Sequence, residues 1–63
     1  MLSKYRLYDV YDGLERLGGF DTMREVRQAA AKRDKETDGE CCLIVSRFVK
    51  SIGAYKVLQN WMY

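Results

Sequence analysis

The chain contains neither histidine nor proline, and its two cysteines are neighbours in the sequence. Histidine is the commonest general base, and no glycine-rich phosphate loop or Cys-x-x-Cys motif is present to suggest another chemistry. Cys41 and Cys42 alone supply too few ligands for a zinc site within one chain. We therefore expect a protein that is not an enzyme, with no catalytic residues, no metal site and no cofactor.

Long apolar segments are absent as well. The longest apolar run, around residues 41–45, is far too short to cross a bilayer, and residues 1–6 lack the apolar region of a secretory signal. The sequence therefore predicts a cytoplasmic protein that makes no membrane contact. Neighbouring residues of a strand point to opposite faces, so Cys41 and Cys42 are expected to be reduced, one thiol in the core and one partly exposed.

Residues 4–20 have the pattern of a β-hairpin. Residues 4–11 are rich in Tyr, Leu and Val, which favours a strand, and residues 14–20 return. Asp12-Gly13 between them suits a two-residue type I′ turn, because both central positions of that turn need positive φ. The sequence therefore predicts a tight antiparallel pair.

This turn predicts a register for the two strands. Asp9 is expected opposite Arg16, as a cross-strand ion pair, and Tyr8 opposite Leu17 on the other face of the sheet. The Gly18-Gly19 pair is expected to form a bulge or a sharp bend where the chain leaves the sheet.

A helix is predicted after the hairpin. Thr22 and Glu25 fit a capping box, and the stretch that follows is rich in Ala, Arg, Gln and Lys, which have high helix propensity. An apolar stripe lies along one side of this helix and consists of Met23, Val26, Ala30 and, on its flank, Ala29. The helix is expected to end at residue 36 or 37, with Gly39 as its stop signal.

Two further strands are predicted after the helix. Residues 40–49 form a near-continuous apolar run with β-branched side chains, typical of a buried and central strand. Residues 50–53 are expected to turn, and residues 54–61, or a longer stretch, to return as a fourth strand. The order predicts an α+β fold, a small two-layer ββαββ domain with one helix packed on an antiparallel-rich four-stranded sheet. Without a repeat or linker, residues 1–63 are expected to form this single domain.

Charged side chains are unevenly distributed along the chain. Eleven Lys and Arg against nine Asp and Glu give a net charge of +2, too balanced to indicate a nucleic-acid binder. All the acids lie in the first forty residues, whereas Arg47, Lys50 and Lys56 follow them. The C-terminal segment is therefore expected to be the positive end, which favours an anionic partner.

One helix covers one face of a sheet, so the other face is expected to carry exposed apolar side chains that mark a contact site. We predict a non-catalytic binding protein that acts through protein–protein contact. Its predicted partner-binding residues are Tyr8, Leu17, Trp61 and Tyr63. By analogy, small stand-alone chains of this kind often come from phages or other mobile elements, where they inhibit host machinery such as a defence nuclease.

Two alternatives stay open. Aromatic residues interleaved with cations also suit a nucleic-acid-binding module that uses the sheet aromatics or the basic helix face. The residues for that function are Arg24, Arg27, Lys32, Lys35, Arg47 and Lys56. A homodimer is the other alternative, since a fourth strand at the edge of the sheet can pair with a second copy.

A hairpin followed by Phe20-Asp21-Thr22-x-x-Glu25 and a helix resembles the arm-type DNA-binding domains that open phage recombinases. The resemblance covers about residues 4–31. Those domains often have three strands before the helix and require none after it, so the strand pair predicted for residues 41–63 departs from their pattern. The resemblance assigns no role to an individual residue here.

Overall fold

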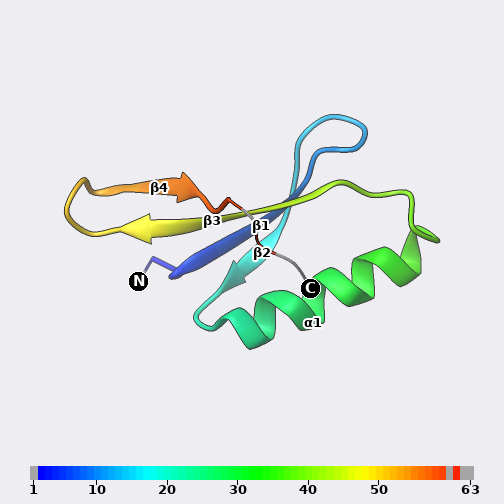
Figure 1. Ribbon diagram of the computed structural model, residues 1–63, viewed down its shortest axis with the longest axis horizontal. Coiled ribbons are helices and arrows are strands. Elements are labelled where there is room, and N and C mark those ends of the chain that lie inside the picture. The colour runs from blue at the N-terminus through cyan, green and yellow to red at the C-terminus, as the bar shows by residue number, and fades with distance from the viewer. Residues whose placement is uncertain (1, 60, 62–63) are drawn as a thin grey trace.

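The computed structural model describes residues 2–59 and 61. Its elements are β1 (Tyr5–Asp9), β2 (Glu15–Phe20), α1 (Met23–Glu36), β3 (Leu43–Val49) and β4 (Ala54–Val57) (Figure 1). The four strands form one antiparallel sheet in the order β2-β1-β3-β4. The predicted ββαββ order and α+β class are confirmed, and β3 is one of the two inner strands, as expected.

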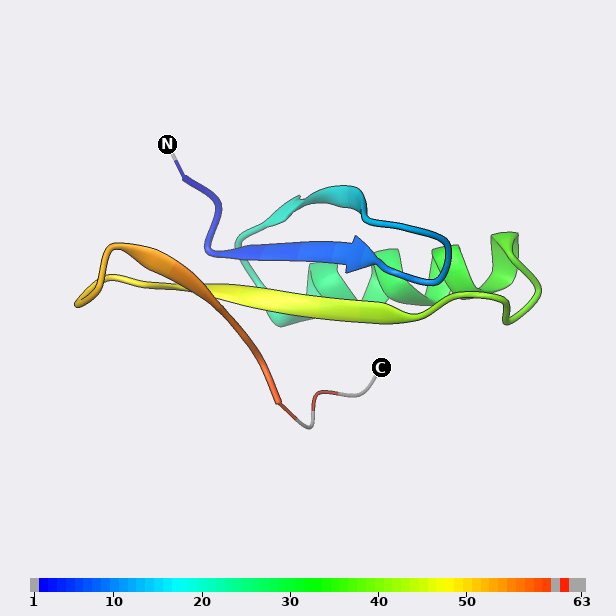
Figure 2. The same ribbon diagram turned by 90° about the horizontal axis from the view of Figure 1, so that it is seen from above.

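The helix and the sheet form two layers. Seen from above, the strands lie in front of α1, which runs behind one half of the sheet (Figure 2). The β3–β4 hairpin extends beyond the helix in both views, so this end of the sheet has no helix under it. The loop between β1 and β2 and the C-terminal end of α1 lie at the opposite end (Figure 1).

The core lies between α1 and the face of the sheet that it covers. Leu7, Val26 and Val45 are fully buried, because alternate residues of the strands point towards the helix. Ala30, one turn after Val26, completes the contact from the helix side, as the predicted apolar stripe requires. Burying one Leu or Val side chain is worth about 1.5–3 kcal/mol, so these few residues carry much of the stability of so small a domain.

The segment after β4 covers part of the sheet that the helix does not reach. The backbone amide of Leu58 donates to the carbonyl of Val45 at 2.8 Å, which continues the β3–β4 pairing beyond Val57. Leu58 and Trp61 are half-buried and pack against the core residues. The C-terminal segment therefore completes the layer that α1 begins.

Both ends of α1 match their predicted signals. The Thr22 hydroxyl accepts from the backbone amide of Glu25 at 3.2 Å, so the predicted N-cap is confirmed. The Glu25 carboxylate accepts at 3.0 Å from the Thr22 hydroxyl, whereas the capping box predicts a bond from the Thr22 amide. The helix ends at Glu36, and Gly39 follows with a φ of 83°, a conformation that favours glycine.

The predicted register of the first hairpin is correct at one end and wrong at the other. Gly18 lies opposite Leu7 as predicted, but Arg16, rather than Leu17, lies opposite Tyr8. A bulge at Leu17 causes the shift, because an extra residue in one strand displaces every later pair by one. The bulge also places Leu17 on the helix side, where it packs against the core.

The predicted pair of Asp9 and Arg16 is therefore also wrong. Asp9 lies opposite Glu15 and points towards the helix, whereas Arg16 lies opposite Tyr8 on the other face. Five residues, 10–14, connect the two strands in place of a two-residue turn. The third and fourth strands are shorter than predicted, since β3 begins at Leu43 and β4 ends at Val57.

Candidate functional site

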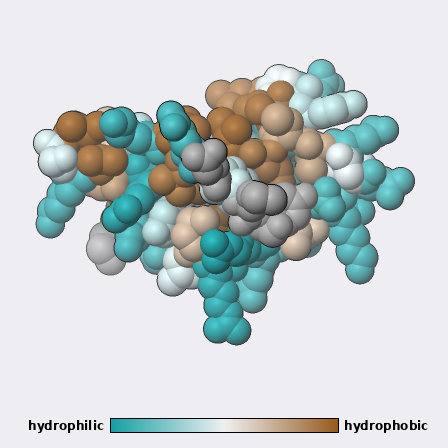
Figure 3. Space-filling model, viewed as in Figure 1, coloured by the Kyte–Doolittle hydropathy of each residue, from teal (hydrophilic) through white to brown (hydrophobic). Residues whose placement is uncertain are grey.

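One face of the sheet points away from α1, and we call it the open face. Strand pairing places side chains of β1, β3 and β4 together there, since Tyr8 lies opposite Ile44 and Phe48 lies opposite Tyr55. The aromatic and apolar members of the open face are Tyr8, Ile44, Phe48, Tyr55 and Val57. The first four are half-buried and Val57 is 58% exposed. Brown, apolar side chains gather over the strands in Figure 3, whereas the side chains of the helix below are mostly teal.

A cation and two rings pack against each other on the open face. The guanidinium of Arg6 lies 3.8 Å from the centre of the Tyr55 ring, and the Phe48 and Tyr55 rings meet edge to face at 5.3 Å. The Tyr55 hydroxyl donates to the carbonyl of Ser3, so the N-terminal segment holds this ring in place. A cation over an aromatic ring contributes about 0.5–1 kcal/mol at an exposed site. The aromatic part of the open face is therefore preorganised.

Two polar atoms lie buried beneath this surface. Arg6 and Ser46 occupy directly opposed positions of β1 and β3, and Ser46 is only 5% exposed. Neither Arg6 Nε nor Ser46 Oγ has a hydrogen-bond partner among the described residues. The middle of the open face therefore contains a donor and a hydroxyl among apolar side chains.

The β3–β4 turn and the adjoining strand ends form a positively charged region, which we call the basic hairpin, made of Arg47, Lys50 and Lys56. Arg47 and Lys56 are directly opposed across β3 and β4, and all three side chains are exposed. Like charges in directly opposed positions destabilise a strand pair. An open recess of about 570 Å³ runs along this hairpin, and its described lining contains no acidic side chain.

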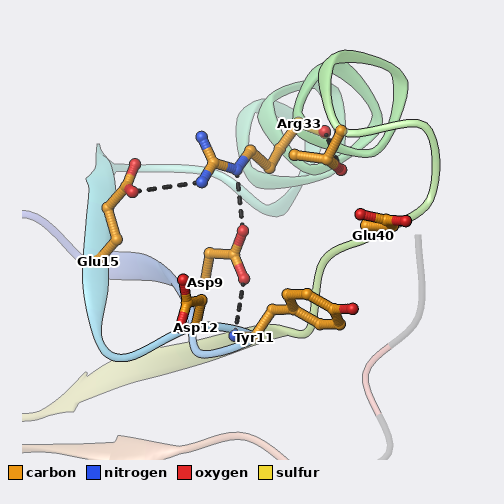
Figure 4. A pocket seen from close by; sticks show the side chains of 7 residues that line it. Asp9, Tyr11, Asp12, Glu15, Arg33 and Glu40 are labelled. Carbon is orange, nitrogen blue, oxygen red and sulfur yellow. Dashed lines mark hydrogen bonds and ion pairs between the residues drawn. The ribbon is translucent and has the colours of Figure 1, made fainter.

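The opposite end of the molecule holds an acidic recess of about 380 Å³. Its lining side chains are Asp9, Tyr11, Asp12, Glu15, Arg33, Thr37 and Glu40 (Figure 4). Arg33 reaches into the recess from α1, where its Nε donates to Asp9 at 2.9 Å and another guanidinium nitrogen donates to Glu15 at 3.3 Å. One cation from the helix is thus paired with two acids.

Asp9 is the centre of this recess. It accepts from the backbone amide of Tyr11 at 3.0 Å and from that of Cys42 at 3.2 Å, besides Arg33. The amide of Tyr11, helped by Arg33 and Cys42, lowers the pKa of Asp9 below its ordinary value of 3.8, although burial acts the other way. The bond to Asp9 likewise raises the pKa of Arg33. Asp9 therefore stays ionised and joins β1, the loop after it, the entry to β3 and α1.

No metal-binding arrangement is found in the described part of the chain. Among residues 2–59 and 61, no three Cys, Asp or Glu side chains are grouped so that they could hold an ion. Cys42 is exposed, and the half-buried thiol of Cys41 lies 3.8 Å from the Asp34 carboxylate. In the same residues, no helix is both long and apolar enough to cross a membrane.

The four predicted partner-binding residues do not form one surface. Tyr8 lies on the open face, Leu17 packs on the helix side, and Trp61 packs against the core. Tyr63 lies outside the described residues. Sequence reasoning missed Ile44 and Phe48 as members of the open face, because only the strand order places Ile44 beside Tyr8 and Phe48 beside Tyr55.

The residues predicted for nucleic-acid binding are exposed but lie on two separate elements. Four come from α1 (Arg24, Arg27, Lys32 and Lys35) and two from the basic hairpin (Arg47 and Lys56). The hairpin extends beyond the helix (Figures 1 and 2), and strand pairing with Tyr5 places Arg47 and Lys56 on the face of the sheet that α1 covers. Arg33, between the helix cations in sequence, turns instead to the acidic recess.

Three regions thus differ in chemistry: an apolar open face, a basic hairpin and an acidic recess held together by Arg33. Comparison with known proteins adds no assignment to them, since no family, no curated protein and no solved structure matches this chain.

Proposed function

We propose that this chain is a non-catalytic binding protein that docks a protein partner on the open face of its sheet. A single observation carries the proposal. Tyr8, Ile44, Phe48 and Tyr55 lie on the face of the sheet that α1 does not cover, and they remain partly exposed. Apolar surface of this kind on a small domain is typical of contact sites.

The composition of the open face favours a protein over a nucleic acid. Tyr and Arg are enriched at the energetically important positions of protein interfaces, and here Arg6 stacks on Tyr55. Arg6 and Arg16 are the cations among the register positions of this face, and Arg6 is half-buried against a ring. A phosphate backbone needs several exposed cations, so apolar contact accounts better for this surface.

The biological role we propose is inhibition of a larger machine. A small domain that presents one rigid surface can block a partner without any chemistry of its own. By analogy with small proteins of phages and mobile elements, the partner would be host machinery such as a defence nuclease. This step rests on the analogy, whereas the docking surface rests on the residues above.

A matched pair of tyrosine variants tests the docking surface. Tyr8→Ala removes a ring from the open face, and Tyr11→Ala removes a ring that is 61% exposed in the loop after β1. Tagged wild type and both variants are recovered from cells that produce the protein, with and without nuclease treatment, and co-purified proteins are quantified by mass spectrometry. We expect one protein to be lost with Tyr8→Ala, kept with Tyr11→Ala and insensitive to nuclease. Equal recovery by all three would refute the surface, provided circular dichroism shows each variant folded.

Nucleic-acid binding is the second candidate function, and the basic hairpin favours it. Arg47 and Lys56 lie opposite each other without an ion pair among the described residues, and Lys50 lies in the same recess. Anisotropy of labelled single-stranded DNA and RNA at two salt concentrations tests it. Phosphate contacts would give an affinity that falls steeply with salt and is weakened by Arg47→Gln. No binding at low salt eliminates this candidate.

A further inference from the structure

Strand β4 is one edge of the sheet and has no neighbouring strand on its outer side in the described chain. Its hydrogen-bonding pattern follows from one bond, the one that the Leu58 amide donates to Val45. Hydrogen-bonded and non-hydrogen-bonded pairs alternate along an antiparallel ladder, so the backbone groups of Tyr55 and Val57 point away from β3. An extended polypeptide can pair with such an edge.

The two faces of β4 differ in chemistry. Lys56 points to the same face as Arg47, its cross-strand neighbour, whereas Tyr55 and Val57 point to the open face. A strand added at this edge would place alternate side chains on the same two faces. Its residues on one face would meet Lys56, with Arg47 one strand further in, and its residues on the other would meet an aromatic and an apolar side chain.

Arg47 and Lys56 have no ion-pair partner among the described residues. The ion pairs of Asp9 and Glu15 are both with Arg33, which lies at the far end of the molecule from β4. Arg47 and Lys56 are exposed and opposed as like charges, an arrangement that weakens the strand pair. An anionic side chain placed near them would attract both cations and so offset their mutual repulsion.

We propose that the edge of β4 accepts an extended segment of a protein partner whose side chains alternate between acidic and apolar. An acidic side chain lies beside Lys56, on the face that Arg47 shares one strand further in, and the apolar ones lie beside Tyr55 and Val57. The backbone of the segment pairs with the outward groups of β4. This inference rests on the proposed function in that the occupant is a protein, and it adds the chemistry of the segment that is recognised.

The same observations disfavour two other occupants. Antiparallel pairing of β4 with a second copy would bring Arg47 and Lys56 of both chains to one face, so repulsion opposes a homodimer at this edge. A nucleic acid would satisfy the cations but has no extended amide backbone to pair with Tyr55 and Val57. The acidic and apolar polypeptide satisfies both sets of groups.

Titration of the ¹⁵N-labelled protein with capped peptides of equal length tests the inference by nuclear magnetic resonance. The probe peptide alternates Glu and Val. One control peptide alternates Lys and Val, and a second groups the same Glu and Val residues in two blocks. A third control is the alternating Glu–Val peptide with N-methyl groups along one edge of its backbone. We expect the alternating Glu–Val peptide alone to bind and to shift the amide signals of Tyr55 and Val57. The peptide controls need no change in the protein, so their result does not depend on a variant that folds.

A charge-reversal variant adds a readout that a merely structural role would not give. Lys56→Glu turns the like-charged pair with Arg47 into an opposite-charged one, so we expect a higher denaturation midpoint together with peptide binding weakened about tenfold or more. Lys32→Glu, an exposed charge reversal on α1, should leave peptide binding unchanged. Stability and binding thus move in opposite directions only for the variant at the edge.

Several outcomes would overturn the inference. The alternating peptide could fail to bind, or the block, Lys–Val or N-methylated peptide could bind equally well. Lys56→Glu could leave the affinity for the alternating peptide unchanged. The protein could also prefer a single-stranded oligonucleotide or dimerise through β4. Shifts confined to Tyr8 and Ile44 would also overturn it while supporting docking on the open face. Conversely, edge binding of the peptide together with equal partner recovery by Tyr8→Ala would leave the inference standing and remove the proposed open-face site.

Discussion

Asp9 of β1 and Arg33 of α1 form an ion pair of 2.9 Å that joins the two layers of the domain across 24 residues of sequence. The Asp9 side chain is only 5% exposed, and two backbone amides donate to it besides Arg33. Burying a carboxylate is tolerated when its charge is paired and its oxygens are hydrogen-bonded, and Asp9 meets both conditions. The pair fixes α1 against the end of the sheet that lies opposite the basic hairpin.

The Asp9–Arg33 pair predicts a pH dependence of stability. The folded pKa of Asp9 lies below its unfolded value of about 3.9, so ionised Asp9 favours the folded state. This contribution is fully present above the unfolded pKa and is lost as the pH falls through the lower, folded pKa. Asp9→Asn should therefore lower the melting temperature at neutral pH, and its difference from wild type should shrink below about pH 4. Thermal denaturation of both proteins from pH 7 to pH 2 measures this.

Asp12→Asn is the matched control, because Asp12 lies exposed in the same recess with no ion pair among the described residues. It should change the melting temperature little at any pH. A difference between wild type and Asp9→Asn that stayed constant down to pH 2 would contradict the role given to the Asp9 charge.

We expect the largest single loss of stability when the Leu7 side chain is truncated. This side chain is fully buried in the same core cluster as Val26 and Val45, and truncating a buried leucine costs about 2–5 kcal/mol. Leu7→Ala should thus remove a large part of the 5–15 kcal/mol typical of a folded domain. Leu14→Ala, at a position 74% exposed, should cost within about 0.5 kcal/mol. Urea denaturation compares the two, and similar losses would contradict the placement of the core.

We expect a smaller loss of stability when the Thr22 side chain at the start of α1 is removed. Its hydroxyl accepts from the Glu25 amide, so Thr22→Ala should lower the free energy of unfolding by about 1 kcal/mol. Ser51→Ala, an exposed hydroxyl in the turn between β3 and β4, serves as the control and should have little effect. The same urea titrations, followed by far-ultraviolet circular dichroism, measure both. Equal midpoints for Thr22→Ala and wild type would contradict the capping role.

A variant at Leu17 tests whether this side chain serves the stability of the fold or the binding of a partner. Since the bulge turns its side chain towards the helix and the core, Leu17→Ala should lower the free energy of unfolding but leave partner recovery per folded molecule unchanged. Denaturation and the quantitative recovery described above supply the two readings. Loss of the partner from a fully stable variant would return Leu17 to the binding surface.

The elements of this fold were largely predictable because their signals are local. The capping residues Thr22 and Glu25 lie within one turn, and the stripe of Val26 and Ala30 depends only on helical periodicity. The apolar run of β3 predicts a central strand because both of its faces carry apolar residues. Each of these inferences needs only a few neighbouring residues.

What could not be predicted depends on contacts between distant residues. Asp9 and Arg33 are far apart in sequence, and a nearby Arg16 offered a plausible partner that the bulge at Leu17 removed. The open face likewise depends on the strand order, since Tyr8 meets Ile44 only because β1 lies beside β3. A one-residue bulge and one strand neighbour thus decide which side chains the protein presents.

Site-resolved photocrosslinking tests the central claim most directly. A photoreactive phenylalanine analogue is placed at Tyr8 on the open face, at Tyr11 in the loop, or at Gln28 on the exposed side of α1, in cells that produce the protein. The open-face account predicts that position 8 crosslinks one defined protein and that positions 11 and 28 do not. Crosslinking of a protein from position 28 with none from position 8, or of nucleic acid alone, would contradict it.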